Sequence, residues 1–179
     1  GTTVIENAAR EPEIVQLCQY LNQMGASISG IGSSRITIDG VESLHPANID
    51  VIPDRIEAGT FLMAGALMGK ITLTDVKPDH LDSVLLKLRE VGSTIETTSN
   101  SITIEPGQLK AVDMTTAVYP GFATDLQAQW VALMSLAKGS SLVTDTVYHD
   151  RFSHVPELNR LGAKISIDKN LFEILLFFI

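Results

Sequence analysis

The stretch LNQMGASI at residues 21–28 recurs as LREVGSTI at residues 88–95 and as LNRLGAKI at residues 158–165. In each copy an apolar run ends in a glycine, and the intervals between these glycines are 92 − 25 = 67 and 162 − 92 = 70 residues. Glycine after such a run is typical of a helix C-terminus, because it adopts positive φ without a steric penalty. A repeat of this length indicates a supersecondary unit that the chain uses three times.

Each copy also contains a helix and several strands. From residue 12 to residue 24 the apolar side chains recur at intervals of three and four residues, which predicts an amphipathic helix with Cys18 on its buried side. Matching helices are predicted near residues 78–91 and 154–161. Strands are predicted before these helices at residues 3–6, 71–74 and 142–145, directly after each glycine, and again at residues 36–39, 102–105 and 170–174.

Two further segments predict helices of a different kind. Residues 61–68 are apolar around the whole circumference of a helix, and residues 130–137 are nearly so. A helix without a polar face must be surrounded by other elements. The other helices are amphipathic and the hairpins alternate polar with apolar residues, as layers that face solvent do. The pattern predicts a mixed α/β (α+β) fold of βαβαββ units, with buried helices inside and sheets outside.

Composition limits the functional classes. The chain has 179 residues, of which 45% are hydrophobic, and a formal net charge of −8. This charge argues against a nucleic-acid or acidic-membrane surface, because phosphate groups demand a dense basic footprint. No apolar run approaches the roughly twenty residues of a membrane helix, and the first residues do not resemble a signal peptide. A single cysteine, Cys18, fits a reducing cytoplasm.

Four segments resemble a known enzyme family. Together they closely resemble the UDP-N-acetylglucosamine 1-carboxyvinyltransferases, a family of enolpyruvyl transferases, and they occur in that family's order. The resemblance implies an EPSP synthase-like fold, in which each of two lobes is an inside-out α/β barrel of three βαβαββ units. In this chain the barrel would be incomplete. The segments are ENAAREPE at residues 6–13, PDRIEAGT at 53–60, YPGFATDLQAQ at 119–129 and RFSHVPEL at 151–158.

The resemblance also implies a boundary. The family's chain crosses between its lobes at the position of Pro53, so residues 1–52 would be the last repeat unit of the first lobe. Residues 53–179 would be the first two units of the second lobe, and the chain would be an interior piece of a longer protein. The family's reactive cysteine loop, its amino-terminal Lys-Asn pair and its carboxy-terminal arginines would then lie elsewhere. We therefore expect this chain alone to be inactive.

The resemblance assigns chemistry to four residues. The family transfers an enolpyruvyl group from phosphoenolpyruvate to the 3′-hydroxyl of UDP-N-acetylglucosamine, with release of phosphate. This is the first committed step of peptidoglycan precursor synthesis, which serves cell-wall growth, cell shape and cell division, and it occurs in the cytoplasm. By resemblance Asp125 is the base that accepts the hydroxyl proton, and Thr124, Val147 and Arg151 belong to the substrate site.

The residues alone leave structural interpretations open. Thr124 or Asp125 stands just before an apolar helix, where a short acceptor caps free amides. Asp54 holds the matching place before the other apolar helix and therefore provides an internal comparison. Val147 also fits an ordinary apolar residue at a strand end, and Arg151 fits a solvated charge at a helix start.

A metal site is the competing chemical interpretation. His149 stands where the family commonly has glutamate, and His149, Asp150 and His154 lie close in sequence. Their spacing fits no strong zinc pattern. The chain has no glycine-rich nucleotide loop of the Rossmann or Walker type either. We therefore expect no metal and no cofactor.

Three functions remain as hypotheses. The first is part of an enolpyruvyl transferase that acts on UDP-N-acetylglucosamine and phosphoenolpyruvate, with no nucleic-acid or membrane partner. The second is a non-catalytic scaffold that self-associates, because residues 175–179 are all apolar and would need to pair with a sheet edge or a second chain. The third is the related shikimate-pathway enolpyruvyl transferase, which these four segments match poorly.

Overall fold

The computed structural model describes residues 1–148, 150–168 and 171–175. The chain divides into two compact units, Gly1–Ile52 and Pro53–Ile179. The assignment of these units to two different lobes stays a prediction. The predicted strand start at residue 170, the apolar residues 176–179 and His149 lie outside the described residues. Leu175, the first of the five apolar residues 175–179, lies in a strand and pairs with Ser140 of a neighbouring strand.

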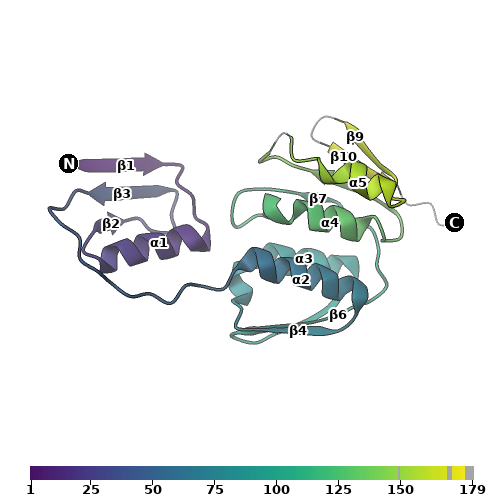
Figure 1. The fold of residues 1–179 in the computed structure, drawn as a ribbon, viewed down its shortest axis with the longest axis horizontal. Coiled ribbons are helices and arrows are strands. Elements are labelled where there is room, and N and C mark those ends of the chain that lie inside the picture. The colour runs from purple at the N-terminus through teal and green to yellow at the C-terminus, as the bar shows by residue number, and fades with distance from the viewer. Residues whose placement is uncertain (149, 169–170, 176–179) are drawn as a thin grey trace. The chain divides into compact units, whose positions relative to one another are not determined.

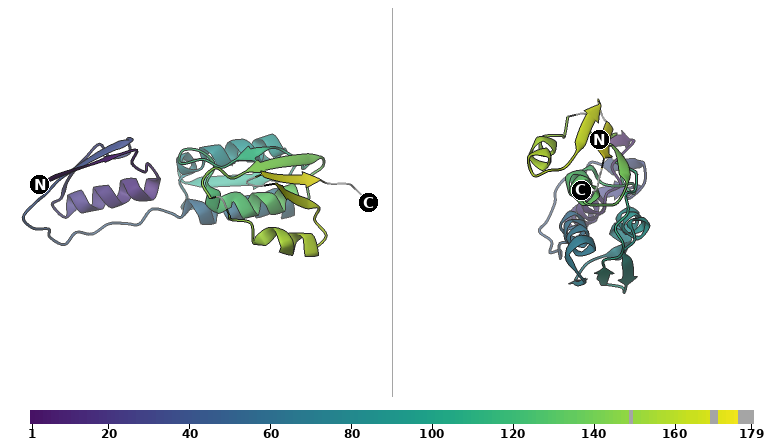
Figure 2. Two further views of the ribbon diagram at one scale, coloured as in Figure 1. Left: turned by 90° about the horizontal axis from the view of Figure 1, so that it is seen from above. Right: turned by 90° about the vertical axis from the view of Figure 1, so that its right-hand side faces the viewer.

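Unit 1 is one copy of the repeat. It contains β1 (Thr2–Glu6), α1 (Pro12–Gln23), β2 (Ser27–Ser29) and β3 (Arg35–Asp39). The strands form an antiparallel sheet in the order β1-β3-β2, and α1 lies along one face of it (Figures 1 and 2). Cys18, Ile28 and Ile36 form its small core, which confirms the predicted burial of Cys18.

Unit 2 contains the other two copies. The first comprises α2 (Arg55–Met68), β4 (Ile71–Thr74), α3 (Asp82–Val91), β5 (Thr94–Thr97) and β6 (Ser101–Glu105), with a 3₁₀ turn at Pro78–His80 in place of the predicted first helical turn. The second comprises β7 (Met114–Thr115), a 3₁₀ turn η2 (Thr124–Leu126), α4 (Gln127–Met134), β8 (Ser140–Thr144), α5 (His154–Arg160), β9 (Ile165–Asp168) and β10 (Leu171–Leu175).

The three copies share one strand order. The sheets read β1-β3-β2, β4-β6-β5 and β8-β10-β9, and all of these pairs are antiparallel. In the third copy β7 adds to the edge of the sheet, parallel to β8. The third strand of each copy therefore inserts between the first two, as expected of one unit used three times.

The glycines of the repeat end the helices in the same way. Gly25, Gly92 and Gly162 have φ of +98°, +117° and +102°. In each copy the residue after the glycine donates its N–H to the carbonyl four residues before the glycine, as Ser93 does to Leu88 at 3.1 Å. This is a Schellman motif, which satisfies carbonyls that the helix leaves unpaired. A Cβ on Gly92 would also lie 2.6 Å from the Gln108 carbonyl oxygen, so a larger residue is excluded there.

The apolar helices α2 and α4 pack together in the middle of unit 2, between its two sheets (Figure 1). Gly59 allows α2 to approach η2, the turn directly before α4, because a Cβ there would lie 2.6 Å from the side chain of Leu126. Leu62 and Trp130 are fully buried. The expectation that these helices are covered on every side is wrong, because several apolar side chains on these segments stay exposed although α2 also packs against α3, β4 and β6. The exposed apolar side chains on these segments are Phe61, Leu67, Met68 and Leu136.

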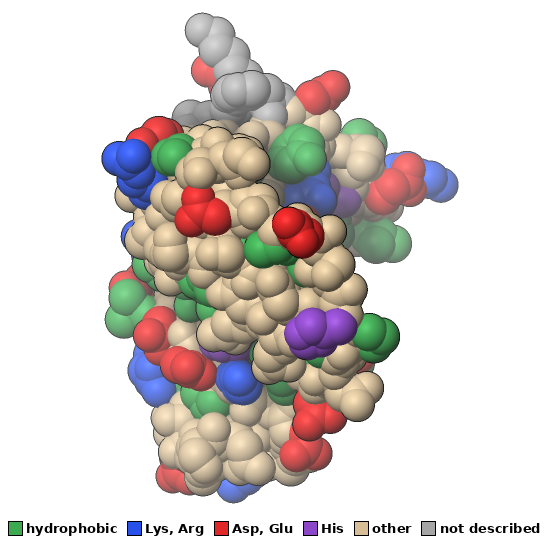
Figure 3. All heavy atoms as spheres, turned by 90° about the vertical axis from the view of Figure 1, so that its left-hand side faces the viewer, with side chains coloured by type: hydrophobic (Ala, Val, Ile, Leu, Met, Phe, Trp, Pro, Cys, Tyr) green, Lys and Arg blue, Asp and Glu red, His purple; other side chains and the backbone are tan. Residues whose placement is uncertain are grey.

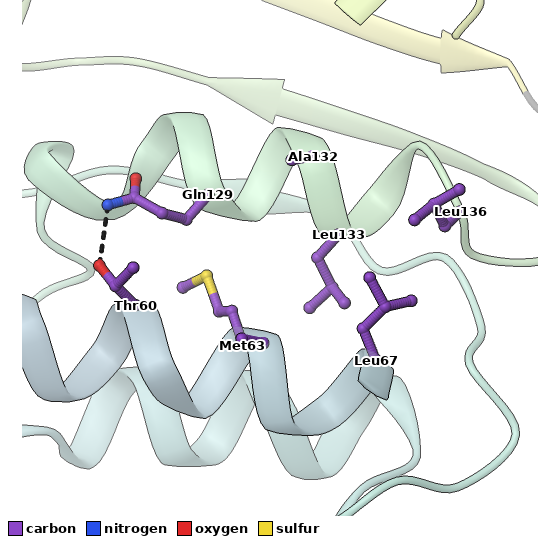
Figure 4. A pocket seen from close by; sticks show the side chains of 8 residues that line it. Thr60, Met63, Leu67, Gln129, Ala132, Leu133 and Leu136 are labelled. Carbon is purple, nitrogen blue, oxygen red and sulfur yellow. Dashed lines mark hydrogen bonds between the residues drawn. The ribbon is translucent and has the colours of Figure 1, made fainter. Parts of the chain in front are cut away.

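An apolar groove of about 240 Å³ runs between α2 and α4. Figure 4 shows Met63 and Leu133 pointing into it, and the side chain of Gln129 donating to the Thr60 hydroxyl at 2.9 Å toward one end. The groove is lined by Thr60, Met63, Ala64, Leu67, Gln129, Ala132, Leu133 and Leu136.

Candidate functional site

The predicted site residues come from two segments of the third copy. Thr124 and Asp125 lie in η2, directly before α4, and Val147 and Arg151 lie in the loop that joins β8 to α5. The structure brings the two segments together, because Arg151 contacts both Thr124 and Asp125. Whether they form a substrate site stays a prediction.

Asp125 does not cap the helix that follows it. The N-cap positions of η2 and α4 are held by Ala123 and Leu126, whose side chains have no acceptor, so the capping interpretation is wrong for both Thr124 and Asp125. The Oδ1 atom of Asp125 instead lies 2.8 Å from Nη1 of Arg151. Half of the Asp125 side chain is exposed, so a ligand in solvent can reach it.

Thr124 connects this ion pair to a second carboxylate. Its hydroxyl donates to Oδ2 of Asp145 at 2.8 Å and accepts from Nη1 of Arg151 at 3.3 Å. The guanidinium of Arg151 also lies over the ring of Tyr148, 5.0 Å from its centroid. Arg151 is therefore held from three directions and is more than a solvated charge at a helix start.

Asp145, which follows β8, was missed by the sequence analysis. It is fully buried, and its Oδ1 accepts from the Thr116 hydroxyl at 2.7 Å and from the amides of Val147 and Tyr148, both at 2.9 Å. Burial alone raises the pKa of Asp145, but the hydrogen bonds from Tyr148, Thr116, Thr124 and Val147 outweigh it, so the pKa lies below its usual value. The carboxyl is therefore ionised at neutral pH.

Val147 has a polar backbone role and a partly exposed side chain. Its backbone N–H donates to Oδ1 of Asp145, and 37% of the residue is exposed to solvent. The adjoining Thr146 is fixed as well, since its amide donates to the Thr116 hydroxyl at 3.0 Å. The loop after β8 is thus held by hydrogen bonds at three successive residues, 146–148.

Gln127 is a second residue that sequence reasoning missed. It begins α4, two residues after Asp125, and is fully buried. Neither its amide nitrogen nor its amide oxygen has a hydrogen-bond partner within the described part of the chain. An unsatisfied buried amide costs roughly 1–3 kcal/mol. The only sequence signal was a glutamine at the start of a largely apolar helix, and Gln129 shares that signal.

The metal interpretation gains no support from the described residues. Among residues 1–148, 150–168 and 171–175, no group of three or more His, Cys, Asp or Glu side chains is placed to hold an ion. His149 lies outside that range, and burial lowers the pKa of His154.

On the face shown in Figure 3, Lys and Arg side chains lie interspersed with Asp and Glu. Among the described helices, none has the length and apolar character to cross a bilayer.

Comparison with known proteins identifies the family. The family model described as EPSP synthase (3-phosphoshikimate 1-carboxyvinyltransferase) matches residues 1–176. The chain belongs to this family. Within it, the chain is 56% identical over 168 residues to the UDP-N-acetylglucosamine 1-carboxyvinyltransferase of Bdellovibrio bacteriovorus, and 53% identical over 171 residues to UDP-N-acetylglucosamine 1-carboxyvinyltransferase 2 of Bacillus subtilis. The resemblance predicted from the four segments is confirmed.

Solved structures confirm the EPSP synthase-like fold. The enolpyruvyl transferase NikO from Streptomyces tendae matches 98% of this chain with a TM-score of 0.86 and 27% identity. The EPSP synthase of Acinetobacter baumannii matches the same share with a TM-score of 0.54 and 19% identity, and supports the fold alone. The alignment with the Bdellovibrio relative includes 93% of this chain but only 41% of the length of that relative.

Proposed function

We propose that this chain is part of an enzyme that transfers the enolpyruvyl group of phosphoenolpyruvate to the 3′-hydroxyl of UDP-N-acetylglucosamine. The observation that carries the proposal is the state of Asp125, whose exposed carboxylate is oriented by Arg151 and is not used to cap a helix. The names of the 51–56% identical relatives support the choice of sugar nucleotide.

Asp125 acts as the general base in this reaction. Its carboxylate accepts the proton of the 3′-hydroxyl while the hydroxyl oxygen bonds to the central carbon of phosphoenolpyruvate and the methylene carbon gains a proton from a general acid. Loss of phosphate and of a proton from the new methyl group then restores the enolpyruvyl double bond. Arg151 holds the Asp125 carboxylate at 2.8 Å and so fixes its direction toward the sugar.

Thr124, Val147 and Arg151 bind the UDP-sugar beside Asp125. Val147 contributes its main chain, which the Asp145 carboxylate holds in place, and Thr124 and Arg151 form the polar wall next to the base. The cations that bind the phosphate and carboxylate of phosphoenolpyruvate are supplied by other parts of the enzyme, since of these four residues only Arg151 is basic.

Under this proposal the enzyme works in the cytoplasm, in peptidoglycan precursor synthesis, and thereby serves cell-wall growth, cell shape and cell division. Its partners are the two small substrates and not a nucleic acid or a membrane. The single cysteine, Cys18, is a buried free thiol, as a reducing compartment allows.

A chimera tests the activity. In it, this chain replaces the matching 168 residues of the Bdellovibrio bacteriovorus relative, and phosphate release is measured with phosphoenolpyruvate and UDP-N-acetylglucosamine. We expect turnover that depends on both substrates. A folded chimera that releases no phosphate contradicts the proposed function.

Binding to the 179-residue chain provides a second test. Two-dimensional amide NMR spectra with UDP-N-acetylglucosamine should show shifts at Asp125 and Val147. Shikimate 3-phosphate is the matched control, because it is the substrate of the related shikimate-pathway transferase. Shifts with shikimate 3-phosphate alone would transfer the assignment to that enzyme.

Self-association is a second candidate function, and the groove between α2 and α4 favours it. The groove is open and apolar, and the exposed side chains of Leu67 and Leu136 stand on its two sides (Figure 4). Covering it with a second chain would bury this surface. Light scattering of the wild-type chain and of Leu67→Glu decides: a dimer that Leu67→Glu converts to a monomer supports this function, and a wild-type monomer rejects it.

A further inference from the structure

The residue that follows the first strand differs between the three copies. Asn7 follows β1 and Asp75 follows β4, and both are exposed turn residues with φ of +52° and +56°. Short polar residues tolerate this left-handed region. In the third copy Asp145 follows β8 and is fully buried. A position that serves a turn in two copies is thus a buried carboxylate in the copy that carries the candidate site.

Asp145 joins three separate segments. Its two oxygens accept from Thr116 after β7, from Thr124 in η2, and from the amides of Val147 and Tyr148 in the loop after β8. The four donors lie at 2.7–2.9 Å, and hydrogen bonds to an ionised acceptor are among the strongest in proteins. The arrangement fixes the hydroxyl of Thr124 and the backbone of Val147 relative to one another.

The same network reaches Asp125 through Arg151. Nη1 of Arg151 donates to the Thr124 hydroxyl at 3.3 Å and forms an ion pair with Oδ1 of Asp125 at 2.8 Å, and the guanidinium lies over the ring of Tyr148. Both Thr124 and Tyr148 are bonded to Asp145. The direction of the Asp125 carboxylate therefore depends on Asp145 through two routes.

We propose that Asp145 is the positioning residue of the UDP-sugar site, which sets Thr124 and the Val147 main chain for binding and aims Asp125 through Arg151. This inference rests on the proposed function. Asp145 is buried and does not touch the substrate. Its ionised state at neutral pH agrees with this role, since only a carboxylate offers acceptors to all four donors.

Asp145→Asn in the chimera tests the proposal. Asparagine keeps the size and one acceptor oxygen but presents an NH₂ donor to the Thr124 hydroxyl. The oxygen of that hydroxyl already accepts a hydrogen bond from Arg151, so the bond from Thr124 to residue 145 is lost. We expect KM for UDP-N-acetylglucosamine to rise and kcat to fall, each by about tenfold, while KM for phosphoenolpyruvate changes less than twofold. Asp75→Asn is the matched control and should leave all three constants unchanged.

The pattern of constants separates positioning from simple destabilisation. A variant that only contains less folded enzyme has a lower apparent kcat with both KM values unchanged. Thr124→Val removes the hydroxyl that joins Asp145 to Arg151 and should therefore raise KM for the UDP-sugar as Asp145→Asn does. Unchanged constants in Asp145→Asn, or a fall in kcat alone, would overturn the positioning role and leave the proposed function intact.

A ligand-free experiment keeps the two proposals distinguishable if the wild-type chimera is inactive. In NMR spectra of the 179-residue chain, Asp145→Asn should shift the amides of Val147 and Tyr148 and the guanidinium signal of Arg151, and Asp75→Asn should shift none of them. An inactive wild-type chimera refutes the proposed function. An unmoved Arg151 signal refutes the positioning by Asp145.

Discussion

Asp54 and Asp125 stand at matching places, just before the apolar helices α2 and α4 of unit 2. Asp54 accepts hydrogen bonds from the amides of Ile56 at 2.7 Å and Glu57 at 3.2 Å, and so caps α2. Asp125 accepts none of these bonds and pairs with Arg151. One aspartate caps its helix, and the other forms an ion pair with the loop after β8.

The residues two positions after these aspartates, Ile56 and Gln127, also differ in how they are packed. Ile56 in α2 packs partly buried against the core, whereas Gln127 in α4 is fully buried with no partner for its amide within the described residues. The start of α4 thus lacks a cap and carries a buried polar group at the same place. Proteins commonly break local rules of stability where a site requires it, and the proposed function places its site at the start of α4.

The largest effect should come from Asp125→Asn in the chimera. Because the amide is not a base, kcat should fall about 10²–10⁴-fold, while the free energy of unfolding should change by no more than about 1 kcal/mol, since only a half-exposed ion pair is lost. Phosphate release and urea unfolding measure the two quantities.

Asp54→Asn is the control for that substitution. Asparagine caps helices as well as aspartate does, so both turnover and stability should stay at the wild-type level. Equal losses of activity in the two variants would break the comparison, because the two aspartates would then have the same role.

The sequence predicted the repeat well because its signals are local. Most of the glycine-ended helices and the strands before them appear within a residue or two of their predicted bounds, as at Ile71–Thr74 and His154–Arg160. The exception is α3, which begins at Asp82 and not near residue 78, because a 3₁₀ turn precedes it. The contacts of Asp145 could not be predicted, because they join residues 116, 124 and 147 only once β7 pairs with β8 and α4 packs beneath them. For the same reason the sequence left the capping and catalytic interpretations of Asp125 open.

Gln127→Met should stabilise unit 2. The methionine has nearly the same shape but no polar atom to leave unsatisfied, so the free energy of unfolding should rise by about 1–3 kcal/mol. Urea unfolding followed by the fluorescence of Trp130 reports on this unit, since Trp130 is the single tryptophan and is buried in α4.

Gln129→Met is the matched control on the same helix. Its amide donates to Thr60 at 2.9 Å, so its loss should lower stability by about 1 kcal/mol. A loss of stability in Gln127→Met would show that the amide of Gln127 is satisfied in solution, and the contrast with Ile56 would disappear.

Asp54→Ala should lower stability by a smaller amount. It removes the cap of α2 and should cost about 1 kcal/mol, whereas Asp125→Ala removes no cap and should cost less. The fluorescence of Trp130 again provides the measurement, because α2 packs against α4. If Asp125→Ala costs as much as Asp54→Ala, Asp125 caps its helix in solution and is less available as a base.

The smallest effect concerns pH, because burial opposes the hydrogen bonds that lower the pKa of Asp145. A carboxyl whose folded pKa is lowered stabilises the fold at every pH above its unfolded pKa of about 3.9. That stabilisation is lost as the pH falls through the lower folded pKa.

The stability difference between wild type and Asp145→Asn should therefore be constant above about pH 5 and shrink below about pH 4. Urea unfolding from pH 3 to pH 7 measures this difference, with Asp75→Asn as the matched substitution at the corresponding exposed position of the second copy. If the stability difference between wild type and Asp145→Asn stays constant down to pH 3, the fold does not favour the ionised form of Asp145. The contrast between the buried carboxylate of the third copy and the turn residue Asp75 of the second copy would then have no energetic consequence.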